Sequence, residues 1–477
     1  MHEFMSREKD LVKNTVVLSV GKFLPKLCSF ITLPVLTACL TKAEYGTYDL
    51  IATLIMLIIP IATLQIQSAA FRFLIDCRGD HDASAGIISN IFVVTIPVTL
   101  IASFIIQLFF TDFGLPTRLL ITAYFFFDTI QLTIGQITRG LGNNKVYSIG
   151  SIILSVVYTI GIIAGVSVCR GGFPAVIAAL TIAQIAAIIY LSWSIRLLSY
   201  ISWHKISVVQ IKKLLAYSWP MVPNNLSTWV LKLSDRLVIT AFLGVEANAV
   251  YAVANKIPNI LSMAQSVMVM AWHENASIAA KDSDASEYYS KMLDKVFSLM
   301  FGCTGLLIAA TPLLFMLLIR GDYGQAYYQM PVLILAMFFF VMSSYFGGIY
   351  IAHKKTVNVG ISTMVAAGIN LLIDLCFVRV IGIWAGSVST LTAYAVLYYY
   401  RMLNCQKFQP LTVNYRKQFG QIGILIVLLI CCFLQHPILN IVNVLAACLM
   451  MWLFNRELVM DALKSLKRKT KSFKKTD

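Results

Sequence analysis

Charged residues are scarce in this chain of 477 residues. Asp, Glu, Lys and Arg make up 13% of it, whereas hydrophobic residues make up 58%. The mean hydropathy of +0.78 is far from the balance of a soluble domain. This composition excludes an ordinary soluble protein and indicates a polytopic membrane protein.

Motifs for metal, cofactor or nucleotide chemistry are missing as well. The ten cysteines lack the paired spacing of a zinc site or a disulfide framework, and the six histidines form no HxxxH or HExxH cluster. No GxxxxGK[ST] phosphate loop occurs. We therefore expect no metal, no cofactor and no ATP-driven step within this chain.

Long apolar runs are what the sequence has in abundance. A helix needs about 20 apolar residues to cross a hydrocarbon core of roughly 30 Å. Scanning for such runs predicts an all-α protein with about fourteen membrane-spanning helices. They cover approximately residues 14–40, 46–70, 87–110, 118–138, 147–169, 174–195, 217–243, 248–271, 292–318, 328–351, 357–378, 383–402, 418–434 and 438–455.

Acidic residues are outnumbered, with 22 Asp and Glu against 38 Lys and Arg. Of the 38, 28 fall on the side that carries the N-terminus and five on the opposite side. Because positive charge gathers on the cytoplasmic side, we expect both termini to be cytoplasmic, with Lys42, Arg118, Arg170 and Arg320 on the outer face.

We interpret the basic tail, residues 457–477, as a segment near anionic headgroups rather than a nucleic-acid site. The first apolar run has no cleavage-site pattern, so we expect a retained anchor.

The chain repeats itself weakly. "CLTKAEYGTYDLIATL" (residues 39–54) aligns with "FLGVEANAVYAVANKI" (242–257), and "NNKVYSIG" (143–150) aligns with "HKKTVNVG" (353–360). Continued along the chain, the second alignment pairs Gly172 with Gly382. These matches fall at equivalent places in spans 1–6 and 7–12, which predicts a parallel repeat about an axis along the membrane normal. We expect an N-terminal lobe (1–200), a C-terminal lobe (201–410), two additional helices (411–456) and a cytoplasmic tail (457–477).

Several stretches together resemble bacterial polysaccharide transporters of the O-antigen flippase type. They are "GKFLPKLCSFITLPVLT", "LTKAEYGTYDL", "SAAFRFL", "RGLGNNKVYS", "YSWPMVPNNLSTWVLKLSDRLVITAFLG" and "VYAVANKIP". This family belongs to the superfamily of lipid II flippases and multidrug and toxin extrusion carriers. The resemblance implies fourteen helices in two six-helix lobes, with helices 1, 2, 7 and 8 lining a central cavity. It also implies that an undecaprenyl-diphosphate-linked oligosaccharide is moved from the cytoplasmic to the outer leaflet. Ala249 departs from the pattern, because the second lobe often has a glycine there that matches Gly46.

Away from the ends of the predicted spans lie five cations, on three of the four helices that the family uses for its cavity: Lys22, Lys26, Lys232, Arg236 and Lys256. Intramembrane cations cost several kcal/mol unless they face water or a partner, so they mark a functional pathway. We interpret them as a ladder of positive charge for the substrate diphosphate. Alternatively, Lys22 snorkels to the headgroups, Arg236 pairs with Asp235, and Lys256 only marks a helix end.

Carboxylates are sparse, which makes those inside predicted spans informative, and three of them are candidates: Asp128, Asp235 and Asp374. Asp128 is the candidate for a titrating, coupling group, because desolvation brings a carboxyl toward the range where it exchanges protons. The alternative is a hydrogen-bonded structural acid. We expect Asp235 and Asp374 to balance part of the positive charge of the ladder, and we interpret Arg72, at the cytoplasmic end of span 2, as an entrance contact for phosphates.

Six of the thirteen prolines lie on spans 1, 2, 7 and 8 or at their ends. Pro25 adjoins Lys26, and Pro258 follows Lys256 by two residues. Since proline kinks a helix, we interpret Pro25 and Pro258 as hinges that move the charges. The alternative is that prolines are simply common in membrane helices.

Three function classes compete. A flippase for lipid-linked oligosaccharides in the bacterial inner membrane explains the repeat and the cations, and its partners would be that substrate, membrane lipids, and a polysaccharide polymerase with its chain-length machinery. A multidrug exporter of the same fold would need acidic rather than basic groups. A membrane-embedded polymerase or glycosyltransferase would need a large outer loop, which this chain lacks. Neither the sugar nor the coupling ion can be read from the sequence.

Overall fold

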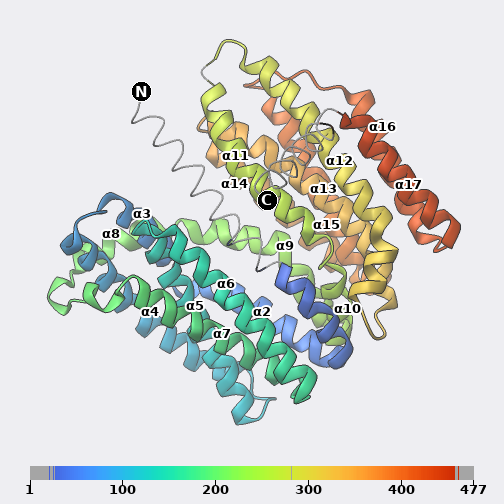
Figure 1. Ribbon diagram of the computed structural model, residues 1–477. Coiled ribbons are helices and arrows are strands. Elements are labelled where there is room, and N and C mark those ends of the chain that lie inside the picture. The colour runs from blue at the N-terminus through green and yellow to red at the C-terminus, as the bar shows by residue number, and fades with distance from the viewer. Residues whose placement is uncertain (1–20, 22–24, 26, 281, 457–459, 461–477) are drawn as a thin grey trace, which may run out of the picture. The chain divides into compact units, whose positions relative to one another are not determined.

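The computed structural model describes residues 21, 25, 27–280, 282–456 and 460 (Figure 1). Every element in these residues is helical. The chain forms two compact units, which we describe separately: unit 1 comprises residues 1–249 and 318–321, and unit 2 comprises residues 250–317 and 322–477. Unit 1 thus extends past residue 200. A repeat boundary and a packing boundary are different properties, so the division into lobes at residue 200 stays a prediction.

Unit 1 holds the first predicted spans and the helices that follow them. After the helix Leu27–Cys39 come α2 (Lys42–Ala62), α3 (Ile66–Asp76), α4 (His81–Phe109), α5 (Leu115–Gly140), α6 (Asn144–Ile162), the π-helix η1 (Ile163–Val168), α7 (Gly172–Ser194), the short 3-10 helices η2 (Leu197–Tyr200) and η3 (Trp203–Lys205), α8 (Val208–Ser218) and α9 (Met221–Leu243). The next helix, α10 (Val245–Ala254), begins in unit 1.

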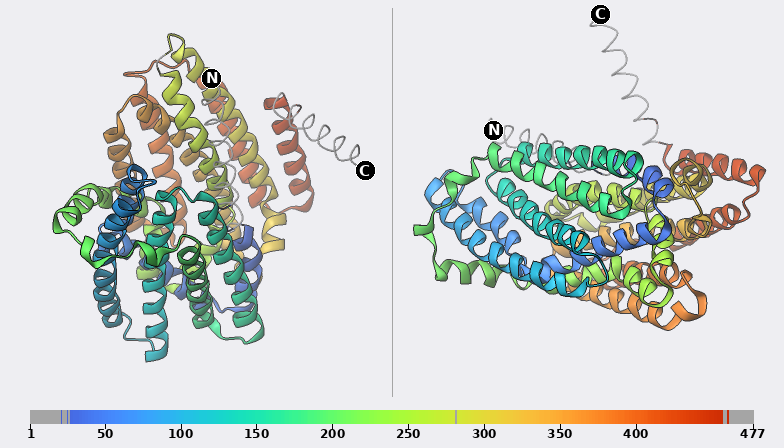
Figure 2. Two further views of the ribbon diagram at one scale, coloured as in Figure 1. Left: turned by 60° about the vertical axis from the view of Figure 1, so that its left-hand side comes forward. Right: turned by 90° about the horizontal axis from the view of Figure 1, so that it is seen from below.

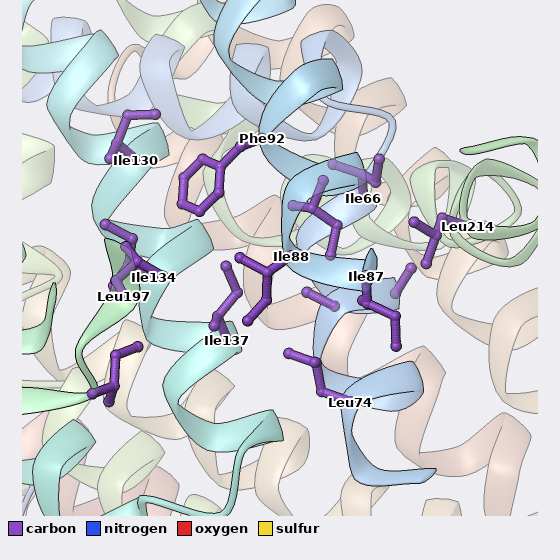
Figure 3. Close-up of a cluster of buried hydrophobic side chains, with 14 of the residues drawn as sticks. Ile66, Leu74, Ile87, Ile88, Phe92, Ile130, Ile134, Ile137, Leu197 and Leu214 are labelled. Atoms are coloured by element: carbon purple, nitrogen blue, oxygen red, sulfur yellow. The ribbon is translucent and has the colours of Figure 1, made fainter. Parts of the chain in front are cut away.

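The core of unit 1 brings α3, α4, α5, α7 and α8 together around branched aliphatic side chains. Figure 3 shows Ile66 and Leu74 of α3 facing Ile88 of α4 and Ile137 of α5. Leu214 of α8 is fully buried in the same cluster. β-Branched side chains with few rotamers fill such a core at little entropic cost. This packing fixes α8 against α3 and α4.

Unit 2 contains α11 (Asn259–Ala279), α12 (Ala285–Leu318), α13 (Gly324–Ala352), α14 (Thr356–Ile381), α15 (Trp384–Cys405), α16 (Tyr415–Phe433) and α17 (Pro437–Phe454). The apolar stretch of α13 is almost entirely buried, so this helix forms the centre of the unit. Its Phe338 and Phe346 pack against Phe297 of α12 and Tyr398 of α15. The hairpin of α16 and α17 lies at the edge of this bundle (Figure 2).

The predicted fold class is confirmed: the chain is an all-α polytopic membrane protein. Nine helices of the described residues are long and apolar enough to cross a membrane. Four further long helices, α5, α9, α11 and α15, are more polar, and Leu27–Cys39 is shorter. Within the described residues, each of the fourteen predicted spans therefore corresponds to one helix or to a broken pair of helices, and the first half of span 1 lies largely outside them.

Two predicted spans are interrupted, which the sequence analysis did not foresee. Span 2 divides into α2 and α3 after Pro60, where Leu64 and Gln65 adopt left-handed φ angles of 47° and 56°. Span 8 divides into α10 and α11 at residues 255–258, where Pro258 cannot donate a backbone hydrogen bond. The ten residues of α10 are about 15 Å long, so this second break falls halfway through a 30 Å core.

Matching backbone conformations support the repeat. Gly172, the first residue of α7, and Gly382, two residues before α15, have positive φ angles of 61° and 60°, which glycine adopts without strain. The sequence alignment pairs these two residues. The pairing of α2 with α10 is less regular, because the two helices begin at aligned residues, Lys42 and Val245, but α2 has 21 residues and α10 has ten.

Candidate functional site

A buried ion pair joins two helices of unit 1. Arg236 of α9 places Nη1 2.7 Å from Asp49 Oδ1 of α2, and the same nitrogen donates to Thr53 Oγ1 at 3.3 Å. The Asp49 side chain is 4% exposed and that of Arg236 is 14% exposed. Removing one partner of such a pair leaves an uncompensated buried charge, which costs about 3–5 kcal/mol. The pair therefore fixes the guanidinium in one place.

Depth along the helices agrees with this pairing. Asp49 is about 10 Å from the first residue of α2, and Arg236 is about 10 Å from the last residue of α9. The two helices run in opposite directions in the predicted topology, so these two ends lie on the same, predicted outer, side. The ion pair thus lies inside the predicted hydrocarbon layer.

Neighbouring contacts hold the backbone around the ion pair. Trp229 of α9 donates Nε1–H to the carbonyl of Thr53 at 3.2 Å. Asn248 of α10 donates Nδ2–H to the carbonyl of Gly46 at 3.2 Å and lies 3.5 Å from Asp49 Oδ2. A Cβ atom on Gly46 would clash with the carbonyl oxygen of Val245, so only glycine permits this approach. Gly46 and Ala249, which the repeat aligns, accordingly lie beside each other.

The sequence analysis missed Asp49 and offered Asp235 as the alternative partner of Arg236. The partner that the structure shows is Asp49, 187 residues away along the chain. One available signal was the place of Asp49 inside predicted span 2, which makes it an intramembrane carboxylate. On α9, Asp235 is buried and Lys232 is exposed. The roles of both residues stay predictions.

Asp128 lies half-buried on α5 and accepts a hydrogen bond of 2.8 Å from Gln184 Nε2 of α7. Gln184 is buried, and its Oε1 has no hydrogen-bond partner among the described residues. Since the two ends of a glutamine amide can exchange places, this pair has two arrangements. A charged Asp128 accepts from the amide N–H, and a protonated Asp128 donates to the amide oxygen.

Aromatic residues connect the surroundings of Asp128 with α2. Tyr124, one turn before Asp128, is buried in a cluster against which Tyr48 packs. The Tyr48 hydroxyl is 3.4 Å from that of Tyr158 on α6. Tyr48 therefore links α2 both to α6, through the two hydroxyl groups, and to the cluster that contains Tyr124 of α5.

Arg72 lies at the end of α3, where its Nη1 is 2.6 Å from Asp76 Oδ1 and both side chains are exposed. The hydrogen bond to Asp76 raises the pKa of Arg72 further above its ordinary value, so the guanidinium is charged at every relevant pH. An exposed pair of this kind holds its charge within reach of a soluble or headgroup phosphate.

The remaining predicted site residues lie in unit 2 or near the N-terminus. Lys256 is half-buried and lies, with Pro258 two residues on, in the break between α10 and α11. Asp374 is buried on α14. Pro25 is half-buried, whereas Lys22 and Lys26 lie outside the described residues. The hinge roles of Pro25 and Pro258 and the charge-balancing role of Asp374 stay predictions.

A buried arginine in unit 2 also escaped the sequence analysis. Arg401 of α15 is 5% exposed and donates to four neutral oxygen atoms at 2.9–3.2 Å, which belong to Ser362, Ser343, Val359 and Thr363. It thereby links one end of α15 to α13 and α14. Its place at the last turn of an apolar span was the available signal.

Among the described residues, no group of three or more His, Cys, Asp or Glu could hold a metal ion.

Solved structures show which class of protein has this fold. A lipid II flippase, MurJ, in an inward closed conformation matches with a TM-score of 0.70 and 12% identity, covering 94% of this chain and 100% of that chain. A MATE transporter from Vibrio cholerae matches with a TM-score of 0.60 and 13% identity, over 85% of this chain and 98% of that one. A MOP superfamily transporter from Pyrococcus furiosus matches with a TM-score of 0.59 and 12% identity, covering 82% of this chain and 94% of that chain. The fold is therefore that of the MOP superfamily, whose members named here are membrane transporters and a flippase.

The family follows from the sequence itself. Residues 11–273, more than half of the chain, match the model of a family described as polysaccharide biosynthesis protein. This chain belongs to that family. No curated protein matches it.

Proposed function

We propose that this protein is a flippase that moves an undecaprenyl-diphosphate-linked oligosaccharide from the cytoplasmic to the outer leaflet by alternating access. The repeat unit would be of the O-antigen, capsule or exopolysaccharide type. Support comes from the family, which belongs to polysaccharide biosynthesis, and from the fold, which matches that of a lipid II flippase. Lipid II and the proposed substrate share a lipid-linked glycan.

The intramembrane cations carry the proposal from family to substrate. A diphosphate that crosses hydrocarbon needs compensating charge, because a charge without a partner in low dielectric is very costly. Arg236 supplies a positive charge at a fixed position. The free-energy cost of burying this guanidinium is offset by Asp49 at 2.7 Å. Lys232, one turn earlier on α9, is exposed, and Lys256 lies in a break of the helical backbone. We infer that these residues, with Lys22, Lys26 and Arg72, contact the substrate phosphates in turn.

We further propose that Asp128 couples transport to a proton. Its bond with Gln184 has one arrangement for each protonation state, so the Asp128 carboxyl keeps a hydrogen-bond partner whether it is charged or protonated. The charge of Asp235 and Asp374 would balance the cations. Each elementary charge moved through 100 mV is worth about 2.3 kcal/mol, so a few charges are enough to bias a two-state carrier.

The proposed setting is the bacterial inner membrane, with both termini in the cytoplasm. The partners would be the lipid-linked oligosaccharide and membrane lipids, and a polymerase with chain-length machinery would act on the flipped product. The protein would then be a transporter without enzymatic activity of its own.

The decisive experiment tests charge at Lys26 and Lys232. Lys26→Arg should retain transport, whereas Lys26→Gln and Lys232→Gln should each stall it, with lipid-linked sugar accumulating in the inner leaflet. The measurement is surface polysaccharide in a transporter-null strain complemented with each variant at matched membrane abundance. Lys145→Gln, which changes an exposed lysine at the start of α6, is the matched control and should complement fully.

Full complementation by the double variant Lys26→Gln with Lys232→Gln would show that the cations are incidental. A multidrug exporter, the alternative function, predicts that outcome together with export of a cationic dye from the same cells.

A further inference from the structure

The segment between α7 and α8, residues 195–207, which we call the connector, is fastened along the first half of α4. Ser89 of α4 accepts a hydrogen bond of 2.9 Å from the backbone N–H of Ser202 and donates one of 3.2 Å to the carbonyl of Tyr200. Asn90 donates to the carbonyl of Lys205 at 3.0 Å and accepts from the N–H of Ser207 at 2.8 Å. The connector is therefore a built part of unit 1, although it has only two short 3-10 helices.

Charged and aromatic contacts add to this attachment nearer the start of α4. Lys205 Nζ is 2.6 Å from Asp82 Oδ1, and the ring of His81 stacks on Tyr200 with centroids 4.4 Å apart. α8 follows the connector and lies beside α3 and α4 (Figure 1). Connector and α8 together form one surface of unit 1.

Helix length places the connector at the membrane surface. The 29 residues of α4 are about 43 Å long, which exceeds a hydrocarbon core of roughly 30 Å by eight or nine residues. Large apolar side chains of α4 are exposed from Ile96 to Phe109, whereas the helix begins with His81 and Asp82. The excess residues are thus the first ones, and Ser89 and Asn90, which hold the connector, lie at the level of the headgroups.

This surface exposes large apolar side chains that unit 1 leaves uncovered. Leu198 is 82% exposed, Trp193 at the end of α7 is 80% exposed, and Trp203 is 76% exposed. Tryptophan favours the boundary between hydrocarbon and headgroups because it is apolar and also carries a hydrogen-bond donor. A groove of about 310 Å³ lies beside Trp203. Its walls are Phe92, Val93, Ile96 and Pro97 of α4 and Ile201, Trp203 and Ile206 of the connector.

The charge on the same surface has one sign. Residues 195–218, the connector and α8, contain Arg196, Lys205, Lys212 and Lys213 and no Asp or Glu. Arg196, Lys212 and Lys213 are exposed, whereas Lys205 pairs with Asp82. Basic residues beside an apolar surface bind anionic lipid headgroups.

We propose that this surface is a binding site for an anionic phospholipid, with one acyl chain in the groove beside Trp203 and the phosphate at Arg196, Lys212 and Lys213. The groove begins at Ser89, at headgroup level, and continues along α4 into the hydrocarbon layer, which is the direction that an acyl chain takes from its headgroup. The bound lipid belongs to the leaflet on the connector side, which is cytoplasmic in the predicted topology.

Native mass spectrometry of the purified full-length protein tests the headgroup. Phosphatidylglycerol should bind about tenfold or more tightly than phosphatidylcholine with the same acyl chains. The triple variant Arg196→Gln, Lys212→Gln, Lys213→Gln should lose that preference. The control triple variant Lys145→Gln, Lys407→Gln, Arg416→Gln, which removes the same charge from three other exposed positions, should keep it. Equal binding of both lipids by the unaltered protein, or an unchanged preference in the first triple variant, would overturn the proposal.

Fluorescence tests the groove. Phosphatidylglycerol with brominated acyl chains should quench tryptophan emission at low lipid-to-protein ratios, and Trp203→Phe should remove part of that quenching. Trp384→Phe changes a half-buried tryptophan at the start of α15 and should lose the same amount with brominated phosphatidylcholine as with brominated phosphatidylglycerol. If Trp203→Phe leaves the quenching by phosphatidylglycerol unchanged, the chain does not occupy this groove.

Discussion

At the scale of single residues, the Asp49–Arg236 pair sets the electrostatics of unit 1. Both groups are buried, and their separation of 2.7 Å allows a charge-assisted hydrogen bond. The Arg236 side chain is 14% exposed and that of Asp49 is 4% exposed, so each charge depends mainly on the other. This dependence distinguishes the pair from the equally short but exposed Arg72–Asp76 pair.

We expect Asp49→Asn and Arg236→Gln each to destabilise the protein by about 3–5 kcal/mol, because each leaves one buried charge without its partner. The double variant should be less destabilised than the sum of the two single variants. Thermal unfolding of the purified protein in detergent measures this coupling. Arg72→Gln is the control and should change the melting temperature little, since Arg72 is exposed. Additive losses in the double variant would mean that the two charges do not stabilise each other.

Asp128 permits a second prediction at this scale. An asparagine at this position would keep a hydrogen-bonding side chain opposite Gln184 but could not exchange a proton, so Asp128→Asn should make transport independent of the pH gradient while the protein stays folded. The assay is transport in reconstituted vesicles with imposed gradients, accompanied by the melting temperature. Gln184→Glu should shift the pH dependence, because a second carboxyl would share the proton. An unchanged response of Asp128→Asn to the gradient would exclude the coupling role.

At the scale of elements, the position of the break in span 8 makes the second half of the repeat differ from the first. α2 continues for 21 residues from the position aligned with the start of α10, which ends after ten. The break contains Lys256, and Pro258 follows it as the cap of α11. Broken helices at mid-membrane are tolerated where protein or water satisfies the freed backbone groups. The break thus places a cation next to backbone that can change shape.

Pro258→Ala should lengthen the regular helix across residues 255–258, because alanine restores a backbone donor and favours helix. Hydrogen exchange of the peptide around this segment should slow, and transport should fall if bending here is part of the cycle. Pro312→Ala is the matched control, because Pro312 lies inside the continuous helix α12, and it should leave transport unchanged. Unchanged transport by Pro258→Ala despite slower exchange would show that this proline is not a hinge.

At the scale of the whole molecule, the number of spans decides topology. Fourteen spans place both ends of the chain on one side, whereas the nine clearly apolar helices of the described residues alone would place them on opposite sides. We expect reporter fusions after residues 280 and 410 and at both termini to report the cytoplasm. Fusions near Arg170 and Arg320 should report the outside. A fusion after residue 280 or 410 that reports the outside would contradict fourteen spans.

Much of this architecture was available from the sequence. Span positions depend on local composition, because each helix in a membrane must satisfy its own backbone hydrogen bonds and needs a fixed length of apolar residues. The repeat was visible too, and the equal φ angles of Gly172 and Gly382 support it. The breaks after α2 and α10 were missed, since proline alone does not end a membrane helix: Pro97 and Pro312 lie inside continuous helices.

Pairings between distant residues required the tertiary structure. The sequence shows that Arg236 is an expensive intramembrane charge, but the cost is met by Asp49, 187 residues earlier, which only the packing of α9 on α2 brings within 2.7 Å. The same holds for Gln184 beside Asp128 and for the connector on α4. Composition determined the solvent in which this chain folds, because burial in lipid depends on each segment alone. Tertiary structure decided which charges are compensated, because electrostatic energy depends on distances in space that the order of residues does not contain.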